Sequence, residues 1–310
     1  MNNKKVFLAG HNGLVGRAIY KKLKEKGYEK ILTRTRSQLD LLNYNKVLNF
    51  IKRTKPYYVI IAAAKVGGIY SNYKFQAEFI RQNIAIQSNI IHSAYLAGVK
   101  NLIFLGSSCV YPKYCKQPMK EEYLLSGKLE NTNEAYAVAK ISGIKMCESY
   151  NFQYKTNYKC LMPTNTYGPN DNYDSLNSHF FPALIKKIHN LKIKNKDKLT
   201  LWGNGKAKRE MIYVEDVADA CVYFMKKRIK HTLINIGTGK DFTIQQYANI
   251  ILKLLFPIKK IYIKYDKTKP NGTPRKVLDV SLAKKYGWRS KVSLKKGILN
   301  TYHHFLKTNK

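Results

Sequence analysis

Acidic residues are scarce in this chain. Asp and Glu number 19 against 56 Lys and Arg, which gives a formal net charge of +37 at pH 7. The seven histidines are scattered along the sequence, apart from the neighbours His303 and His304. Because no group of His, Cys or carboxylate residues has the spacing of a metal-ligand set, the sequence predicts no bound metal.

Closely spaced cysteine pairs are missing as well. The cysteines form no C-x-x-C motif and no framework of regular spacings. This pattern excludes a small disulfide-stabilised domain and a zinc ribbon, so we expect free thiols in a reducing compartment. The five cysteines are Cys109, Cys115, Cys147, Cys160 and Cys221.

Long apolar runs are also absent. The first apolar stretch, Val6–Ala9, is far too short for the core of a signal peptide. No later stretch has about 18 uninterrupted apolar residues, the length that a membrane-spanning helix needs. We therefore expect a cytoplasmic protein that has no membrane as its partner.

The excess of lysine and arginine makes nucleic acid a candidate partner. The basic residues are spread over most of the chain, with denser patches at 186–198 and 259–269. The chain is also rich in Asn, Ile and Tyr, so a general compositional bias explains the lysines, and a phosphorylated substrate would benefit equally from positive steering. We expect no nucleic-acid partner; an RNA-binding protein on a reused enzyme fold is the remote alternative.

Apolar runs alternate with amphipathic stretches over the first 165 residues. This alternation is typical of a parallel sheet with helices on both faces, so the expected fold class is α/β, with a Rossmann-type doubly wound sheet. Strands are expected at Val6–Ala9, Ile31–Thr33, Tyr57–Ala64, Leu102–Leu105 and Lys159–Met162, and helices at Leu14–Lys26, Tyr44–Thr54, Ala77–Ala97 and Glu134–Tyr154.

The pattern becomes irregular after residues 167–169. We predict a dinucleotide-binding domain over 1–165, to which 203–240 returns, and a smaller C-terminal α/β lobe over 166–310 that contributes to a cleft. Helices are expected at Phe180–Leu191 and Val214–Met225, and strands at Leu199–Trp202, Leu233–Ile236 and Ile261–Tyr265, the last of these in a tail over 256–310.

The stretch VFLAGHNGLVG places three glycines, Gly10, Gly13 and Gly16, directly after the first strand. Glycine lets the backbone approach a pyrophosphate, and the N-terminus of the following helix favours its charge. A glycine-rich structural turn is the alternative. The position at a strand–turn–helix junction favours a dinucleotide site.

No acidic residue directly follows the second strand. NAD sites usually carry an acid there that binds the ribose 2′-hydroxyl. This chain has Arg34 and Arg36, whose guanidiniums suit a 2′-phosphate, so NADPH is the predicted cofactor. Two solvated surface arginines are the alternative, and Asp40 is a candidate for lining the adenine pocket. Small residues after the third strand would let the cofactor lie flat against the sheet: Ala62, Ala63 and Ala64.

The stretch YAVAK places Tyr136 and Lys140 on one face of a helix. A neighbouring ammonium lowers the pKa of a phenol, which suits Tyr136 as general acid toward a carbonyl, and Lys140 can also hold the cofactor ribose. In FLGSSCVYPK, Ser107 ends the preceding strand and could donate a hydrogen bond to the same oxygen. A Y-x-x-x-K spacing alone is mostly structural, but its combination with Ser107 and the glycine turn is specific.

On these residues the chain resembles the extended short-chain dehydrogenases/reductases that act on nucleotide sugars. Within that superfamily it resembles the GDP-L-fucose synthases, which are GDP-4-keto-6-deoxymannose 3,5-epimerase-4-reductases. The resemblance runs almost end to end. It is carried by AGHNGLVG (9–16), AAAKVGGI (62–69), FLGSSCVYPK (104–113), NEAYAVAKISGIKMCESYN (133–151), MPTNTYGPNDNY (162–173), NSHFFPAL (177–184), WGNGKAKRE (202–210), VEDVA (214–218), NIGTG (235–239) and GTPRKVLDV (272–280).

The resemblance implies that Ser107, Tyr136 and Lys140 form a reductase triad and that Cys109 and His179 form an epimerase acid/base pair. The chemistry of a 4-keto sugar agrees, because the ketone acidifies the protons on C3 and C5, and inversion needs one proton-transfer group on each face. Thiols and imidazoles have ordinary pKa values of about 8.5 and about 6.5, close enough to neutrality for both directions of transfer. The alternatives are a packed cysteine and an exposed loop histidine.

The resemblance also implies the remaining ligand contacts. Three departures from the family lie on the substrate side and leave the sugar open: Lys187 replaces a common arginine, Met211 an aromatic residue and Asn271 an aspartate. Cofactor contacts are implied for Asn12, Leu14, Val15, Lys140, Pro163 and His179, and nucleotide-sugar contacts, mainly in the lobe over 166–310, for Ser107, Ser108, Cys109, Asn165, Lys187, Trp202, Arg209 and Lys269.

We therefore predict an NADPH-dependent reductase that acts on the C4 ketone of a GDP-4-keto-6-deoxy sugar, coupled to C3/C5 epimerisation. The alternatives are a C4 reductase of a GDP-heptose or another GDP-deoxysugar with little epimerisation, and an NAD-recycling epimerase or dehydratase. Dehydratases of this superfamily carry an acidic pair where this chain has Ser108-Cys109, which argues against them. The resemblance further implies a homodimer formed through the helices over about 77–98 and 133–153.

Overall fold

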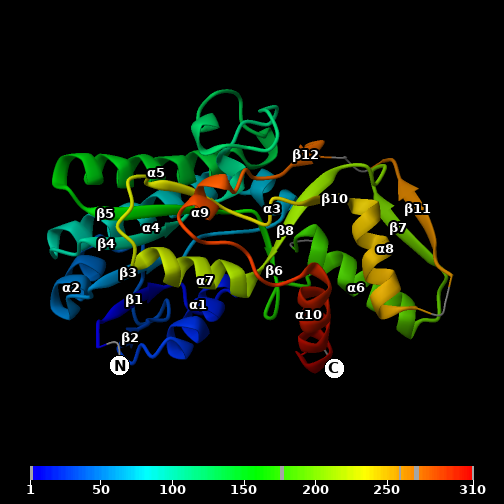
Figure 1. Ribbon diagram of the computed structural model, residues 1–310, viewed down its shortest axis with the longest axis horizontal. Coiled ribbons are helices and arrows are strands. Elements are labelled where there is room, and N and C mark those ends of the chain that lie inside the picture. The colour runs from blue at the N-terminus through cyan, green and yellow to red at the C-terminus, as the bar shows by residue number, and fades with distance from the viewer. Residues whose placement is uncertain (1–2, 175–177, 258–259, 269–271, 309–310) are drawn as a thin grey trace.

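The computed structural model describes residues 3–174, 178–257, 260–268 and 272–308. Lys269 and Asn271 lie outside these residues. Two parts stand side by side in Figure 1: a large parallel sheet with helices above and below it, and a smaller C-terminal lobe around strands β7 (Lys198–Trp202) and β11 (Tyr262–Asp266).

The large sheet has six parallel strands in the order β2-β1-β3-β4-β5-β9. Because the order reverses between β1 and β3, the carboxyl ends of these two strands define the crevice where α/β folds bind ligands. The predicted α/β class with a Rossmann-type sheet is confirmed. The strands are β1 (Val6–Ala9), β2 (Ile31–Leu32), β3 (Tyr58–Ile61), β4 (Asn101–Leu105), β5 (Asn157–Pro163) and β9 (Leu233–Ile236).

Alternating side chains of the strands supply two separate apolar cores. Phe7 and Phe104 face the core under α4 and α5, whereas Leu8 and Leu105 face the core under α1 and α7. Figure 1 shows these helix pairs on opposite sides of the sheet. The helices of this part are α1 (Leu14–Glu25), α2 (Tyr44–Thr54), α3 (Ile69–Lys74), α4 (Gln76–Leu96), α5 (Glu134–Tyr154) and α7 (Val214–Met225).

The C-terminal lobe has its own apolar core, in which Phe181, Ile251 and Phe305 pack together with the inner face of β7. Its helices are α6 (Phe180–Ile193), α8 (Ile244–Leu255) and α10 (Leu294–Thr308). The short helix α9 (Ser281–Lys285) lies against β9 instead and contributes Ala283 to the core under α1 and α7. The strands of the lobe are β7 (Lys198–Trp202) and β11 (Tyr262–Asp266), which pair in parallel, and β6 (Asn165–Tyr167), β8 (Lys208–Tyr213), β10 (Asp241–Thr243) and β12 (Arg275–Lys276), which form a second sheet.

The predicted helices over 44–54, 134–154 and 214–225 match the structure at both ends, and the strand predicted over 57–64 ends earlier, at Ile61. The prediction missed α8 and α10. The start of α8 carries a readable signal, since Thr243 and Gln246 form a reciprocal capping box. β9 joins the large sheet and β8 the second one, and the division into domains stays a prediction.

The buried carboxylate of Glu210 connects the two sheets. It lies on β8 and accepts hydrogen bonds from the backbone N–H groups of Thr238 at 2.5 Å, Gly239 at 2.6 Å and Leu278 at 2.8 Å, and from the Thr238 hydroxyl at 3.2 Å. Burial raises the pKa of this carboxyl, and the four donors oppose that shift. The turn after β9 is thereby fixed to β8.

Replacement of this carboxylate by an amide should weaken the junction. Glu210→Gln keeps the shape but presents an N–H group to a backbone N–H, so one buried donor loses its partner. We expect the free energy of unfolding to fall by about 1–3 kcal/mol in urea titrations. Glu215→Gln, which breaks only a surface ion pair with Lys21, is the matched control and should cost less than about 1 kcal/mol. Equal stability of the two variants would contradict this role of Glu210.

Candidate active site

The glycine turn follows β1 at the reversal point of the sheet. Gly10 has φ +87°, and a Cβ atom there would lie 2.5 Å from the backbone nitrogen of Ala63. A Cβ on Gly16 would overlap the Gly10 carbonyl. Gly13 is the N-cap of α1 and has no side chain to cap it, so the first backbone N–H groups of a 12-residue helix face outward. This geometry fits a pyrophosphate group.

Several other predicted cofactor residues lie in this turn or along the same carboxyl edge of the large sheet. Asn12 accepts a hydrogen bond at its carbonyl from Arg17, and Leu14 begins α1. Val15 is partly buried against the core under α1, and Pro163 ends β5 at the same edge of the sheet. The partly buried Ala62, Ala63 and Ala64 follow β3 directly.

The three cofactor residues predicted after β2, Arg34, Arg36 and Asp40, lie in different environments. Arg34 donates to the Thr33 carbonyl at 2.7 Å, and its guanidinium carbon lies 5.0 Å from the centre of the Phe50 ring. Arg36 is exposed. The carboxylate of Asp40 accepts from the backbone N–H of residue 42 at 3.1 Å, so it stabilises the turn before α2.

The structure brings Ser107, Tyr136 and Lys140 together. Ser107 follows β4, and its hydroxyl is close enough to the Tyr136 phenol to influence the pKa of that phenol. Lys140 Nζ donates to the carbonyl of Leu105, the last residue of β4, at 2.7 Å and lies 5.8 Å from the centre of the Tyr136 ring. The turn spacing of α5 thus places both side chains at the carboxyl end of β4.

Burial shifts both titrating groups toward their neutral forms. It raises the pKa of the Tyr136 phenol, as does the neighbouring sulfur of Cys109, while the hydrogen bond from Ser107 lowers it. Burial lowers the pKa of Lys140 to about 7. At neutral pH Tyr136 therefore keeps its proton and can donate it to a developing oxyanion.

Cys109 lies in the short 3-10 helix after β4 and does not point into the apolar core. Its sulfur accepts a hydrogen bond from Asn133 Nδ2 at 3.2 Å, and Lys276 Nζ lies 3.9 Å away. Arg209 is also close enough for the sulfur to influence the pKa of its guanidinium, which burial lowers and Cys109 raises. Asn133 and Lys276 were not predicted as site residues, although both lie inside the motifs over 133–151 and 272–280 that carry the family resemblance.

His179 is the N-cap residue of α6 and is exposed. The surrounding protein nevertheless lowers the pKa of its imidazole by desolvation, and both properties fit a ring that lines a concave surface. Among the described residues no hydrogen bond or ion pair connects His179 with Cys109, so their pairing stays a prediction.

The predicted substrate residues fall into two groups. In the first, Ser108 directly precedes Cys109 and is buried, and Arg209 on β8 donates to the Thr273 carbonyl at 2.6 Å. Asn165 on β6 donates to the carbonyl of Glu210, the residue after Arg209, at 3.0 Å. In the C-terminal lobe, Lys187 Nζ lies 5.5 Å from the centre of the Trp202 ring, and the Trp202 side chain is 56% exposed. Lys269 lies outside the described residues.

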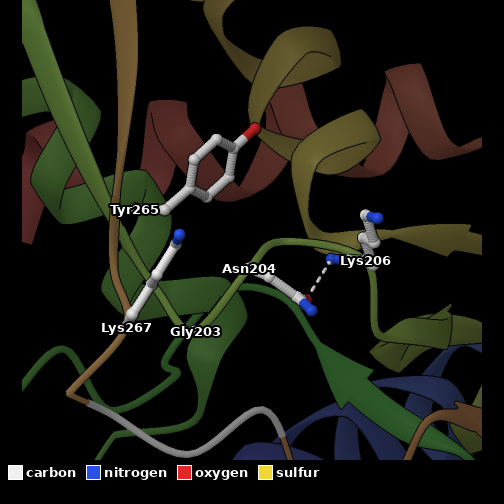
Figure 2. A pocket seen from close by; sticks show the side chains of 5 residues that line it. All are labelled: Gly203, Asn204, Lys206, Tyr265 and Lys267. Atoms are coloured by element: carbon white, nitrogen blue, oxygen red, sulfur yellow. Dashed lines mark hydrogen bonds between the residues drawn. The ribbon is translucent and has the colours of Figure 1, made fainter.

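Two cavities lie outside the triad. One of about 540 Å³ opens in the C-terminal lobe, where Lys206 and Lys267 lie on opposite sides and Tyr265 completes the wall (Figure 2). The second, of about 460 Å³, has Asn12 beside the glycine turn and His304 of α10 in its wall.

In the described parts of the chain no cluster of three His, Cys, Asp or Glu residues could hold a metal, and no helix has the length and apolarity of a bilayer crossing.

Comparisons with known proteins agree with this geometry. The model of the NAD dependent epimerase/dehydratase family matches residues 6–237. The chain is 48% identical over 303 residues to "Putative GDP-L-fucose synthase 2" of Arabidopsis thaliana, a match that covers 97% of this chain and 92% of the relative. It is 45% identical over 315 residues to the GDP-L-fucose synthase of Escherichia coli K12, covering 99% and 98% of the two chains.

A solved structure is similarly close. The GDP-mannoheptose C4 reductase from Campylobacter jejuni with NADP bound superposes with a TM-score of 0.90 at 34% identity, covering 99% of both chains. These matches confirm the resemblance that the motifs indicate. The chain belongs to the NAD dependent epimerase/dehydratase family, within the extended short-chain dehydrogenases/reductases, and inside that family it is similar to the GDP-L-fucose synthases.

Proposed function

We propose that this protein catalyses the NADPH-dependent reduction of the C4 ketone of a GDP-4-keto-6-deoxy sugar, coupled to epimerisation at C3 and C5, with GDP-L-fucose or a related GDP-deoxysugar as product. One observation carries the proposal: Ser107, Tyr136, Lys140 and Cys109 meet at the carboxyl end of β4, on the same edge of the large sheet as the glycine turn. The similarity to GDP-L-fucose synthases over nearly the whole chain supports it.

NADPH fits the described residues. The turn of Gly10, Gly13 and Gly16 and the uncapped start of α1 suit its pyrophosphate, and Arg34 and Arg36 suit its 2′-phosphate. When bound, NADPH supplies the hydride that reduces the carbonyl carbon of the sugar. The NADP-bound heptose reductase of similar fold supports this choice.

The reductase half of the reaction depends on three side chains. Tyr136 donates its proton to the C4 oxygen as that oxygen gains negative charge, and its raised pKa keeps the proton available at neutral pH. Ser107 donates a second hydrogen bond to the same oxygen. Lys140, held by the Leu105 carbonyl, binds the cofactor ribose and lies against the Tyr136 ring.

The epimerase half needs proton transfer on both faces of the sugar. Cys109 lies next to Ser107, so a ketone held by Ser107 and Tyr136 has its adjacent carbons near the sulfur. We assign His179 to the opposite face. Because desolvation lowers the pKa of its imidazole, its neutral form is favoured at pH 7.

The nucleotide end is assigned to the C-terminal lobe. Lys187 and Trp202 offer a cation and an exposed aromatic ring for a guanosine diphosphate, with Arg209 and Lys269 as further partners. We also propose a homodimer formed through α4 and α5, which already pack against each other, and a cytoplasmic location.

A second candidate function is C4 reduction of a GDP-heptose with little epimerisation. The similarity to the Campylobacter jejuni C4 reductase favours it. Incubation with each GDP-4-keto sugar and NADPH in deuterated water separates the candidates, since loss of absorbance at 340 nm reports reduction and deuterium at C3 and C5 reports epimerisation. Absence of NADPH turnover with either sugar, together with retention on heparin, would overturn both in favour of a nucleic-acid role.

Removal of the Tyr136 hydroxyl should block reduction. Tyr136→Phe keeps the ring but leaves no acid for the C4 oxygen, so kcat for NADPH oxidation should fall by about 10²–10⁴-fold. NADPH binding, followed by its fluorescence, should change little. Tyr73→Phe removes a hydroxyl from an exposed ring on α3 and should retain full activity. Turnover by Tyr136→Phe within tenfold of the wild type would contradict the assigned role.

Replacement of Lys140 should raise the stability of the protein at neutral pH and abolish its activity. Since its folded pKa of about 7 lies below its usual value of 10.5, the native state gains stability as pH rises from about 7 toward 10. Lys140→Met removes the unfavourable burial of an ammonium group. At pH 7 its free energy of unfolding should therefore exceed that of the wild type by about 1–3 kcal/mol, and this difference should be smaller at pH 9. Activity should be lost.

Thermal and urea unfolding of both proteins across pH 7–9 checks the sign of this dependence. Lys145→Met, on the exposed face of the same helix, is the control and should show no such pH-dependent difference. A Lys140→Met variant that is less stable at pH 7 and more stable at pH 9 would reverse the expected order.

Loss of the Cys109 thiol should separate the two half-reactions. Cys109→Ser leaves a hydroxyl that is a far poorer base, so deuterium uptake at C3 and C5 should fall by about 100-fold or more. Hydride transfer on an already inverted sugar should survive. Cys115→Ser, which replaces another partly buried thiol, is the control. Equal impairment of uptake and hydride transfer in Cys109→Ser would count against separate roles.

A further inference from the structure

Asn133 occupies an N-cap position that it does not use. It precedes α5, where an asparagine side chain usually accepts a hydrogen bond from a backbone N–H of the first turn, yet no such bond is present. That bond typically contributes about 1 kcal/mol to a helix. Asn43 at the N-cap of α2 makes it with Lys46, which shows the usual behaviour in the same chain.

The side chain of Asn133 turns toward the candidate active site instead. Its Nδ2 donates to Cys109 Sγ at 3.2 Å. Its Oδ1 is buried and has no hydrogen-bond partner among the described residues. A buried acceptor without a partner costs about 1–3 kcal/mol. Asn133, three positions before Tyr136, therefore carries two unfavourable features: the missing capping hydrogen bond and the buried oxygen without a partner.

Both costs have one explanation if a ligand completes the arrangement. An unpaired acceptor beside the candidate base is suited to a hydroxyl group of a bound sugar. The N–H group meanwhile occupies one side of the sulfur and fixes its direction. Lys276, at 3.9 Å, is the second donor to the same sulfur.

We propose that Asn133 binds the substrate and positions Cys109 for epimerisation: its Nδ2–H holds the sulfur, and its Oδ1 accepts a hydrogen bond from a sugar hydroxyl. The inference rests on the proposed function, because it assigns a sugar to the free acceptor. It predicts that Asn133 serves proton exchange at C3 and C5 and leaves hydride transfer at C4 nearly untouched.

The test uses two variants of Asn133 in the full chain, with matched changes at Asn131. Asn133→Ala removes both polar atoms, and Asn133→Asp keeps the shape but replaces the donor by an anionic oxygen. Asn131 lies in the same 3-10 helix and is exposed, so Asn131→Ala and Asn131→Asp control for local stability and for net charge.

Two reaction rates measured with the sugar, deuterium incorporation and hydride transfer, distinguish a specific effect on Cys109 from a general loss of activity. In deuterated water with GDP-4-keto-6-deoxymannose, Asn133→Ala should incorporate deuterium at C3 and C5 about tenfold more slowly than the wild type or slower. The reverse reaction, oxidation of GDP-L-fucose by NADP followed at 340 nm, needs no inversion and should stay within about threefold. A parallel fall of both rates, or the same fall in Asn131→Ala, would overturn the proposal.

A third measurement needs no sugar. Iodoacetamide alkylation of Cys109, followed by mass spectrometry with Cys115 as internal reference, should slow by about fivefold or more in Asn133→Asp, because an anion beside the sulfur disfavours the reactive thiolate. Asn131→Asp should alkylate like the wild type. Unchanged alkylation in Asn133→Asp would overturn the proposed contact. A wild type without turnover but with this alkylation pattern would overturn the proposed function and leave the contact supported.

Discussion

The carboxylate of Glu210 is the interaction on which the arrangement of this molecule depends. It belongs to the second sheet, and its donors lie in the turn after β9 of the large sheet and at Leu278. A buried anion with four donors tolerates little displacement, because each lost hydrogen bond leaves a desolvated partner. Lys276 lies two residues before the donor Leu278, so the same hydrogen bonds help to hold it next to Cys109, which follows β4.

Desolvation sets the chemistry at that edge. Burial raises the pKa of the Tyr136 phenol, which stays protonated, and lowers the pKa of Lys140, which favours its neutral amine. At both residues the charged form is therefore destabilised by the fold. The acid required by a reductase is available at neutral pH for this reason. With the role proposed for Lys140, stability and activity are opposed at this residue, as is common where a fold buries a titrating group for function.

The proposed function assigns two reactions to side chains that are close together after β4. Ser107 contacts Tyr136, and Cys109 contacts Asn133 and Lys276, although only two positions separate Ser107 from Cys109. The 3-10 turn that begins after Ser107 directs the two side chains to different neighbours. A single ketone between them would have its oxygen near the phenol and its neighbouring carbon near the sulfur, which is the geometry that a coupled epimerase and reductase needs.

The sequence by itself determined the α/β class, the glycine turn and the helix that carries Tyr136 and Lys140, because these follow from periodicity and short spacings along one element. It did not reveal α8 and α10, although the capping box at Thr243 was readable. The contact between Cys109 and Lys276 joins residues 167 positions apart. Only the tertiary structure decided this contact, the hydrogen-bond donors of Glu210, and the direction of the Asn133 side chain away from its helix. The reason is that contacts between distant segments produce no periodic pattern in the sequence from which they could be predicted.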